Sequence, residues 1–166
     1  MENKNIFLIG FMGVGKSTIA KLLAKELNAE LIEMDETIEE EAGITINEIF
    51  EKYGESHFRD LESALVERIA DKGGAVVSCG GGAVLRPENV AAMKKNGRVI
   101  FLSATPETIY ERVRFSTNRP LLNGNMNVEY IAQLMERRRN VYEQAADMII
   151  STDGKEKSQI IQEIIG

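Results

Sequence analysis

The stretch GFMGVGKST, from Gly10 to Thr18, separates a short apolar run from a run with helical periodicity. The apolar run before it, IFLIG, is typical of a buried strand, and the KSTIAKLLAKEL run predicts a helix. Gly10, Gly15, Lys16 and Ser17 fit the pattern G-x-x-x-x-G-K-[ST], which in this strand-to-helix context forms a phosphate-binding loop. An ordinary glycine-rich turn is the alternative, but it accounts for neither the lysine nor the flanking elements. The chain is therefore expected to bind a nucleotide.

Each part of this loop has a physical role. Glycine lets the backbone turn its N–H groups inward without Cβ clashes, and the helix that follows adds its positive N-terminal end. Lys16 is expected to reach the terminal phosphates of the nucleotide, and the Ser17 hydroxyl is expected to ligate Mg²⁺ directly. The expected nucleotide-binding residues of the loop are Gly13, Val14, Gly15, Lys16, Ser17 and Thr18.

Strand-like and helix-like segments alternate along the rest of the chain. Apolar runs at residues 29–34, 75–82, 98–103 and 147–152 predict four more strands, with helical patterns between them. Their Val, Ile and Leu residues do not alternate with polar ones, which suits strands that are covered on both faces. The predicted fold is therefore α/β: a three-layer αβα P-loop NTPase with a five-stranded parallel sheet.

The 166 residues are predicted to form a single domain. A helical pattern extends over about residues 35–72 and is broken near Gly43 and Gly54. In a parallel α/β sheet, ligands bind beyond the carboxyl ends of the strands. The candidate functional residues are therefore those that follow the predicted strands.

The 20 basic and 26 acidic residues give a net charge of −6, which argues against binding to nucleic acid or to an anionic membrane. The single cysteine, Cys79, excludes an internal disulfide framework and a cysteine-rich metal site, and it is expected to be a small buried residue. Neither a signal peptide nor an apolar stretch long enough to span a bilayer is visible. A cytoplasmic monomer without a nucleic-acid or membrane partner is expected.

Charged residues and glycines occur where a ligand would bind. Asp35 follows the second predicted strand, glycines follow the third, and Arg59 shares a helical face with Glu62. A carboxylate can orient or deprotonate an attacking hydroxyl, and an arginine can clamp a carboxylate with two hydrogen bonds. Asp35 could instead cap a helix, and Arg59 could form a surface ion pair with Glu62. The arginines at 137–139 could likewise form a solvated helix face.

Four motifs occur in an order that resembles the shikimate kinase family: GxxGxGKST, FRxxE, GGGAV and RPLL. The resemblance extends from Ile6 to about Lys155. Many kinases share the phosphate loop, whereas its combination with the other three motifs is more specific. The resemblance implies a fold like that of the nucleoside monophosphate kinases, with a helical substrate-binding region at about residues 35–72 and a mobile lid at about residues 115–125. It also implies ATP-dependent phosphorylation of the 3-hydroxyl of shikimate, in the chorismate pathway of aromatic amino-acid biosynthesis.

The resemblance further implies roles for single residues. Arg59 and Arg138 would bind the carboxylate of shikimate, and Asp35 would bind its hydroxyls. The residues implied to hold shikimate are Asp35, Arg59, Gly80, Gly81, Gly82 and Arg138. Those implied to bind ATP outside the phosphate loop are Arg112, Arg119 and Lys155. The implied catalytic residues are Lys16, Asp35 and Arg119.

One position departs from the family pattern. Shikimate kinases usually have Asp-x-Asp after the second strand, whereas this chain has EMD, with Glu33 in place of the first aspartate. That residue is expected to help hold Mg²⁺ through water, and glutamate keeps the charge but is one methylene longer. Ser78 is the second expected partner through water, and Ser17 is the direct ligand. Mg²⁺ is thus the expected cofactor, with ATP as co-substrate.

Other functions remain open from the sequence. Gluconate is also a hydroxylated carboxylate, so a gluconate kinase is hard to exclude, whereas a nucleoside monophosphate kinase would need an aromatic stacking surface and only 6% of residues are aromatic. A signalling GTPase would carry an Asn-Lys-x-Asp motif, which is missing. A catalytically silent nucleotide-binding regulator is the alternative from another class. The joint presence of Lys16, Asp35, Arg59 and Arg119 argues against that regulator.

Overall fold

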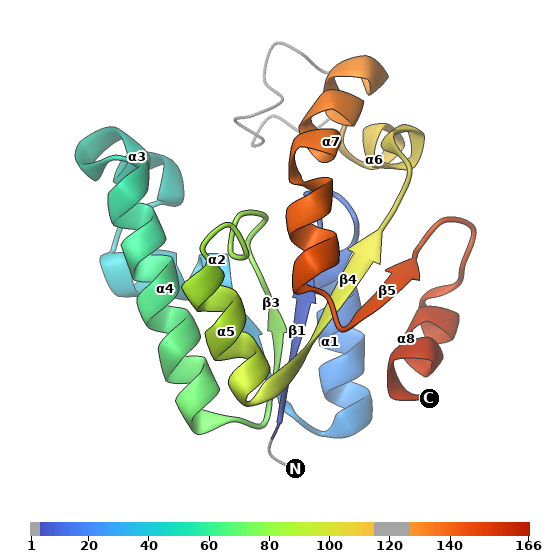
Figure 1. The fold of residues 1–166 in the computed structure, drawn as a ribbon, viewed down its shortest axis with the longest axis horizontal. Helices are drawn as coiled ribbons and strands as arrows, with labels where there is room; N and C mark the ends of the chain where they lie inside the picture. Colours follow the sequence, from blue (N-terminus) through green and yellow to red (C-terminus); the bar gives the residue numbers. More distant parts are fainter. Residues whose placement is uncertain (1–3, 115–126) are drawn as a thin grey trace.

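The computed structural model describes residues 4–114 and 127–166. Within these ranges, five parallel strands form one sheet in the order β2-β3-β1-β4-β5 (Figure 1), which confirms the predicted sheet. The central strand β1 precedes the phosphate loop, and β3 and β4 pair with it on either side. The strands are β1 (Asn5–Ile9), β2 (Glu30–Glu33), β3 (Ala75–Ser78), β4 (Gly97–Ser103) and β5 (Met148–Ser151).

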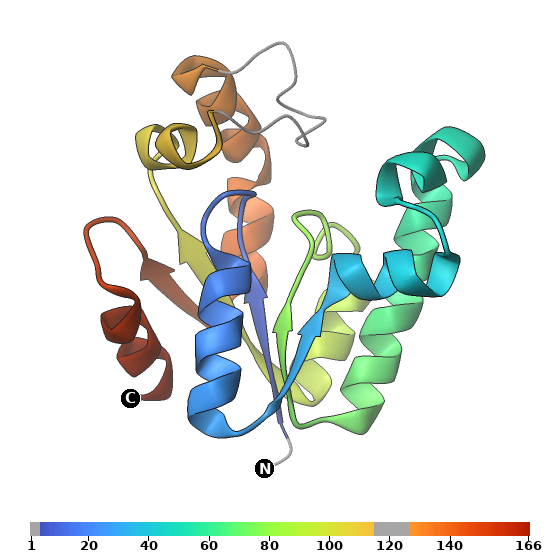
Figure 2. The same cartoon turned by 180° about the vertical axis from the view of Figure 1, so that it is seen from behind.

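Helices connect the strands and cover both faces of the sheet. Helices α1 and α8 lie on one face, whereas α4, α5 and α7 lie on the other (Figures 1 and 2). This arrangement confirms the predicted three layers. The helices are α1 (Lys16–Leu27), α2 (Met34–Ala42), α3 (Ile46–Tyr53), α4 (Glu55–Lys72), α5 (Pro87–Lys95), α6 (Pro106–Val113), α7 (Val128–Ala145) and α8 (Lys157–Ile165).

The hydrophobic core has two parts, one on each side of the sheet. Successive side chains of a strand point to opposite faces. In β1, Phe7 and Ile9 therefore join the cluster with α4 and α5, whereas Leu8 joins the cluster with α1 and α8. Both faces of the central strands are thus buried, which accounts for apolar runs that do not alternate with polar residues.

The predicted helical region after β2 consists of α2, α3 and α4. Gly43 and Gly54 follow α2 and α3 with φ angles of 76° and 89°, a region that glycine adopts without strain. Thr45 begins α3 with a capping box, because its side chain accepts from the Glu48 backbone while the Glu48 carboxylate accepts from Thr45. Both breaks in the helical region were predicted from the sequence.

Element ends differ from the prediction by a few residues. The second strand ends at Glu33, because Met34 already belongs to α2, and α8 begins at Lys157, after a turn in which Lys155 donates to the Thr152 carbonyl. The predicted lid at 115–125 lies outside the described residues. None of the helices in the described ranges is long and apolar enough to cross a membrane.

Candidate active site

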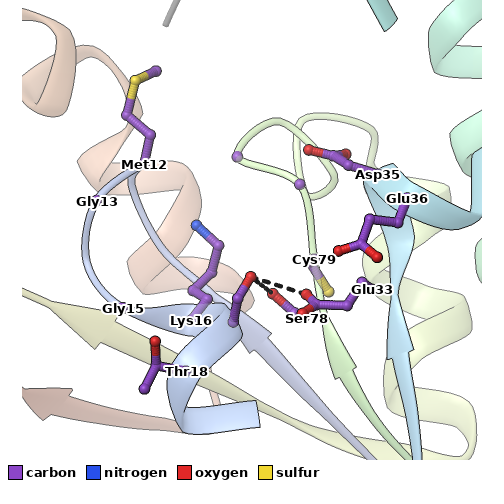
Figure 3. Close-up of a pocket in the computed structure, with 13 residues that line it drawn as sticks. Met12, Gly13, Gly15, Lys16, Thr18, Glu33, Asp35, Glu36, Ser78 and Cys79 are labelled. Atoms are coloured by element: carbon purple, nitrogen blue, oxygen red, sulfur yellow. Dashed lines mark hydrogen bonds between the residues drawn. The ribbon is translucent and has the colours of Figure 1, made fainter. Parts of the chain in front are cut away.

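A cavity of about 340 Å³ lies at the carboxyl ends of β1, β2 and β3 (Figure 3). Its volume is in the range of small-molecule sites, roughly 300–1,000 Å³. It also lies where parallel α/β sheets bind their ligands. The lining residues come from three places: the phosphate loop with the start of α1, the end of β2 with the start of α2, and the segment that follows β3.

The phosphate loop joins β1 to α1 as predicted. Gly13 and Gly15 have φ angles of 80° and 101°, which a residue with a Cβ adopts only with strain. The Lys16 ammonium donates to the carbonyl oxygens of Gly10 and Phe11 at 2.7 Å and 3.2 Å, so it lies over the loop. In Figure 3 its nitrogen points into the space between the phosphate loop and the segment after β3. This position suits contact with a bound phosphate.

Arg112 of α6 supports the same loop from outside the cavity. Its guanidinium donates to the carbonyl oxygens of Gly13 and Val14 at 3.3 Å and 2.9 Å. The Val14 side chain is buried behind the loop. These two predicted ATP-binding residues therefore shape the loop in this structure, and their contact with ATP stays a prediction.

Three oxygen-bearing side chains meet where α1, β2 and β3 come together. The Ser17 hydroxyl donates to Glu33 Oε1 at 2.9 Å and lies 3.4 Å from the Ser78 hydroxyl (Figure 3). Oxygen atoms are the ligands that Mg²⁺ prefers, and the ion commonly keeps several waters. No three Asp, Glu, His or Cys side chains form a metal-binding group among residues 4–114 and 127–166. The donors present therefore fit an ion that takes its remaining ligands from water and phosphate.

Two arginines from different helices lie against the glycines that follow β3. A Cβ added to Gly81 would lie 3.2 Å from Arg138 Nη1, and one added to Gly82 would lie 2.5 Å from Arg59 Nη1. Arg59 belongs to α4 and Arg138 to α7, so the sheet brings together guanidinium groups that are 79 positions apart in the chain. The convergence of these two groups was predicted from the sequence. A larger residue at either glycine would displace a guanidinium.

Two carboxylates lie against the first of these glycines. A Cβ added to Gly80 would lie 2.8 Å from Asp35 Oδ1 and 3.1 Å from Glu62 Oε2. Glu62 is only 1% exposed; its Oε1 accepts from Arg59 at 2.9 Å, and its Oε2 has no hydrogen-bond partner within the described residues. Glu62 therefore orients Arg59 through a buried ion pair on the helical face that the two residues were predicted to share.

Burial changes the acidity of both carboxylates. Desolvation raises the pKa of Glu62 above its usual range, and the neighbouring charge of Arg59 opposes the increase. The pKa of Asp35 is also raised, because protein atoms crowd its inner side, while Lys16 opposes the change. The cavity side of Asp35 is open to solvent, which screens its charge.

The structure brings most of the predicted site residues together. At the edge of the cavity, Arg59 lies against Gly82 and Arg138 lies against Gly81. Lys155 instead pairs with Glu163 of α8 at 2.9 Å, and Arg119 lies outside the described residues. The predicted residues that line the cavity are Gly13, Gly15, Lys16, Ser17, Thr18, Glu33, Asp35, Ser78, Gly80 and Gly81.

Sequence reasoning assigned no role to several residues of the site. Met12, Glu36 and Cys79 also line the cavity, and Cys79 is buried as predicted. Tyr142 of α7 donates its hydroxyl to the Gly81 carbonyl at 2.6 Å. Tyr142 lies four positions after Arg138, so helical spacing could have placed its side chain on the same face.

The sequence model of the shikimate kinase family matches residues 12–166. The shikimate kinase of Persephonella marina is 47% identical over 163 residues, which cover 98% of this chain and 98% of that protein. The shikimate kinase of Thermodesulfovibrio yellowstonii is 44% identical over 162 residues, which cover 98% of this chain and 93% of that protein.

Solved structures agree with the sequence comparison. The shikimate kinase from Acinetobacter baumannii in complex with shikimate has a TM-score of 0.90 at 33% identity, covering 98% of this chain and 90% of that one. The enzyme from Aquifex aeolicus has a TM-score of 0.83 at 36% identity, covering 97% and 94%. A gluconokinase from Sinorhizobium meliloti, at 18% identity and a TM-score of 0.58 over 98% and 89% of the two chains, shares the fold alone.

Proposed function

The chain belongs to the shikimate kinase family, and from that premise we propose that this cavity transfers the γ-phosphoryl group of ATP to the 3-hydroxyl of shikimate. The observation that carries the assignment is the approach of Arg59, Arg138 and Asp35 to one glycine run that lines the same cavity as Lys16. This arrangement supplies a cationic clamp, an acceptor-orienting carboxylate and a phosphate-binding loop in one place.

The phosphates of ATP are proposed to lie over residues 13–18, where the loop N–H groups and the N-terminal end of α1 favour negative charge. Lys16 would contact the terminal phosphates as charge spreads over the transferring group. Ser17 would ligate Mg²⁺ directly, with Glu33 and Ser78 acting through water. When bound, the ion would neutralise charge on the phosphates. Arg119 is proposed to add a cation from the lid.

Shikimate is proposed to lie between Lys16 and the glycine run. The guanidinium groups of Arg59 and Arg138 match the geometry of a carboxylate, and Glu62 orients the first of them. Asp35 would accept a hydrogen bond from the reacting hydroxyl and so align it with the phosphate. Phosphoryl transfer has a loose transition state, so positioning and charge stabilisation supply most of the catalysis.

A coupled assay of ADP release tests this function. The full chain is assayed with MgATP and, separately, with shikimate, gluconate and AMP, and the product is identified by ³¹P NMR. We expect ADP and a 3-phosphate ester with shikimate, and background ADP with the other two acceptors. The matched control is Asp35→Asn, which keeps the shape but not the charge and should lose turnover. Turnover with gluconate and none with shikimate would contradict the assignment.

The cellular setting is a further part of the proposal. We propose a cytoplasmic location, since the pathway substrate is a small polar acid. We also propose a monomer, because the described residues of one chain carry all the proposed binding groups except the lid arginine. Light scattering of the purified chain across micromolar concentrations, with and without ATP, measures its mass. A mass of twice the 18.5 kDa of one chain would contradict the monomer.

A further inference from the structure

Tyr142 connects helix α7 to the glycine run of the proposed shikimate site. Its hydroxyl donates to the Gly81 carbonyl at 2.6 Å, a short hydrogen bond between residues 61 positions apart. Arg138, one helical turn earlier on α7, reaches the same glycine, because a Cβ added to Gly81 would lie 3.2 Å from Arg138 Nη1 and 3.8 Å from the Tyr142 hydroxyl. Since the hydroxyl donates its hydrogen to the Gly81 carbonyl and an arginine can only donate, the lone pairs of the tyrosine oxygen face the guanidinium as an acceptor. The phenol, the guanidinium and the Gly81 peptide therefore meet at one place.

The tyrosine is itself held firmly. It is 3% exposed, and its ring packs on Phe101 of β4 with the ring centroids 5.1 Å apart. Burial raises the pKa of the Tyr142 phenol above its usual range, and the charge of Arg138 opposes this. The hydroxyl therefore keeps its proton at neutral pH and remains a donor to Gly81.

Arg138 needs such support more than Arg59 does. Arg59 forms ion pairs with Glu55 at 3.3 Å and Glu62 at 2.9 Å, which fix its guanidinium from two sides. Within residues 4–114 and 127–166, no carboxylate forms an ion pair with Arg138. The neutral hydroxyl that lies beside the group does not neutralise it, so the charge of Arg138 stays available to a ligand carboxylate.

We propose that Tyr142 is a positioning residue for acceptor binding: its hydroxyl fixes the Gly81 peptide and the Arg138 guanidinium in one arrangement that receives the carboxylate of the acceptor. The inference rests on the proposed function, because it takes the acceptor to be shikimate. The two arginines of the clamp thus differ in kind. One is oriented by carboxylates, and the other is oriented by a phenol that leaves its charge unpaired.

The test is Tyr142→Phe, which removes one oxygen atom and keeps the packing on Phe101. We expect the KM for shikimate to rise up to roughly tenfold, as for the loss of one hydrogen bond. The KM for ATP should stay within about twofold, because the lost hydrogen bond joins α7 to Gly81 and not to the phosphate loop. The dissociation constant for shikimate, measured by titration calorimetry without ATP, should rise by the same factor. Tyr130→Phe, on the first turn of the same helix, is the matched control and should leave both constants unchanged.

A double-mutant cycle decides whether Tyr142 acts through Arg138. The KM for shikimate is measured for Tyr142→Phe, for Arg138→Lys and for the double variant. If the phenol acts by orienting the guanidinium, the increase in the double variant is smaller than the product of the two single increases. Independent, multiplying effects would overturn the proposal, as would a KM for ATP that rises as much as that for shikimate.

The outcomes also separate this proposal from the proposed function. If the unmodified chain phosphorylates shikimate but Tyr142→Phe has an unchanged KM and dissociation constant for it, the positioning role is overturned and the function stands. If the unmodified chain neither binds nor phosphorylates shikimate, both are overturned. The thermal midpoint of Tyr142→Phe is measured in parallel. A fall in that midpoint without a change in the KM for shikimate would indicate a purely structural hydroxyl.

Discussion

The two halves of the cavity are built in different ways. The proposed nucleotide half consists of one continuous loop, residues 13–18, with the Lys16 ammonium lying over it. The proposed acceptor half uses side chains from α2, α4 and α7, which meet over three glycines that have no side chains of their own, Gly80, Gly81 and Gly82. The first half is therefore a local structure, and the second half exists only in the complete fold.

The difference also appears in the energetics. The charged groups of the nucleotide half are partly open to solvent, whereas the acceptor half contains Glu62, a carboxylate that is 1% exposed with one oxygen unpartnered in the described residues. Burying such a group destabilises the protein unless its partner is well placed. We infer that the burial of Glu62 lowers the free energy of unfolding and that its function is to orient Arg59. Substitutions in the two halves should therefore have different effects on activity and stability.

The largest effect is expected in the nucleotide half. Lys16→Ala removes the cation that lies over the phosphate loop, so kcat should fall roughly 100- to 1,000-fold, the range seen when one transition-state contact is removed. The KM for shikimate should change little, because the acceptor half is intact. Steady-state kinetics with both substrates varied measures this. A rate equal to that of the unmodified chain would remove Lys16 from the mechanism.

The next effect is expected in the acceptor half. Arg59→Lys keeps the charge but replaces a planar guanidinium, which can bind a carboxylate in a bidentate manner, with an ammonium, which acts as a point charge. The KM for shikimate should rise roughly 10- to 100-fold, while the KM for ATP stays within a few-fold. The same two-substrate kinetics measures both constants. An effect confined to ATP would move Arg59 out of the acceptor half.

Gly82→Ala should raise the KM for shikimate as Arg59→Lys does, but by less. The added Cβ would lie 2.5 Å from Arg59 Nη1, and the flexible end of that side chain can move aside. We expect the KM for shikimate to rise about tenfold, equivalent to one lost hydrogen bond, with little change in the thermal midpoint. A large fall in the thermal midpoint would show that the glycine serves the fold instead of the site.

The buried carboxylate makes the stability of the ligand-free chain depend on pH. The pKa of Glu62 is raised in the folded state, so the folded chain binds this proton more tightly than the unfolded chain does. The associated stability is present below the unfolded pKa and is lost as the pH rises through the folded pKa. Relative to Glu62→Gln, the unmodified chain should lose thermal stability as the pH rises from 4 to 8. Thermal denaturation across that range measures the difference, and a constant gap would contradict the raised pKa.

The smallest effect is expected at Glu33. Glu33→Asp keeps the charge and shortens the side chain that now accepts from Ser17 at 2.9 Å. The Mg²⁺ concentration that gives half-maximal activity should shift by less than the roughly tenfold typical of substitutions around a metal's direct ligands. Binding of Mn²⁺ in the presence of ADP, followed by electron paramagnetic resonance, provides a readout that does not depend on turnover. Identical titrations would identify Glu33 as a bystander.

The same contrast explains what could be predicted from the sequence. Lys16 and Ser17 are recognisable because their motif is contiguous, and β1, β3 and β4 are recognisable because their apolar runs are buried on both faces. Arg138 could be selected from three neighbouring arginines only through the family resemblance. The role of Tyr142 could not be predicted, because it depends on the distance between α7 and a glycine 61 positions away. The start of α2 was misplaced because Met34 suits a strand as well as a helix.

The glycine run after β3 has a consequence for how such an enzyme could acquire another substrate. Since these glycines present only backbone, the shape of the proposed acceptor pocket is set by the side chains from three helices that pack against them. A methyl group at any one of the three would disturb one or two neighbours without creating a new pocket. Evolution toward a different acidic substrate would then have to replace those side chains together and keep the glycine run.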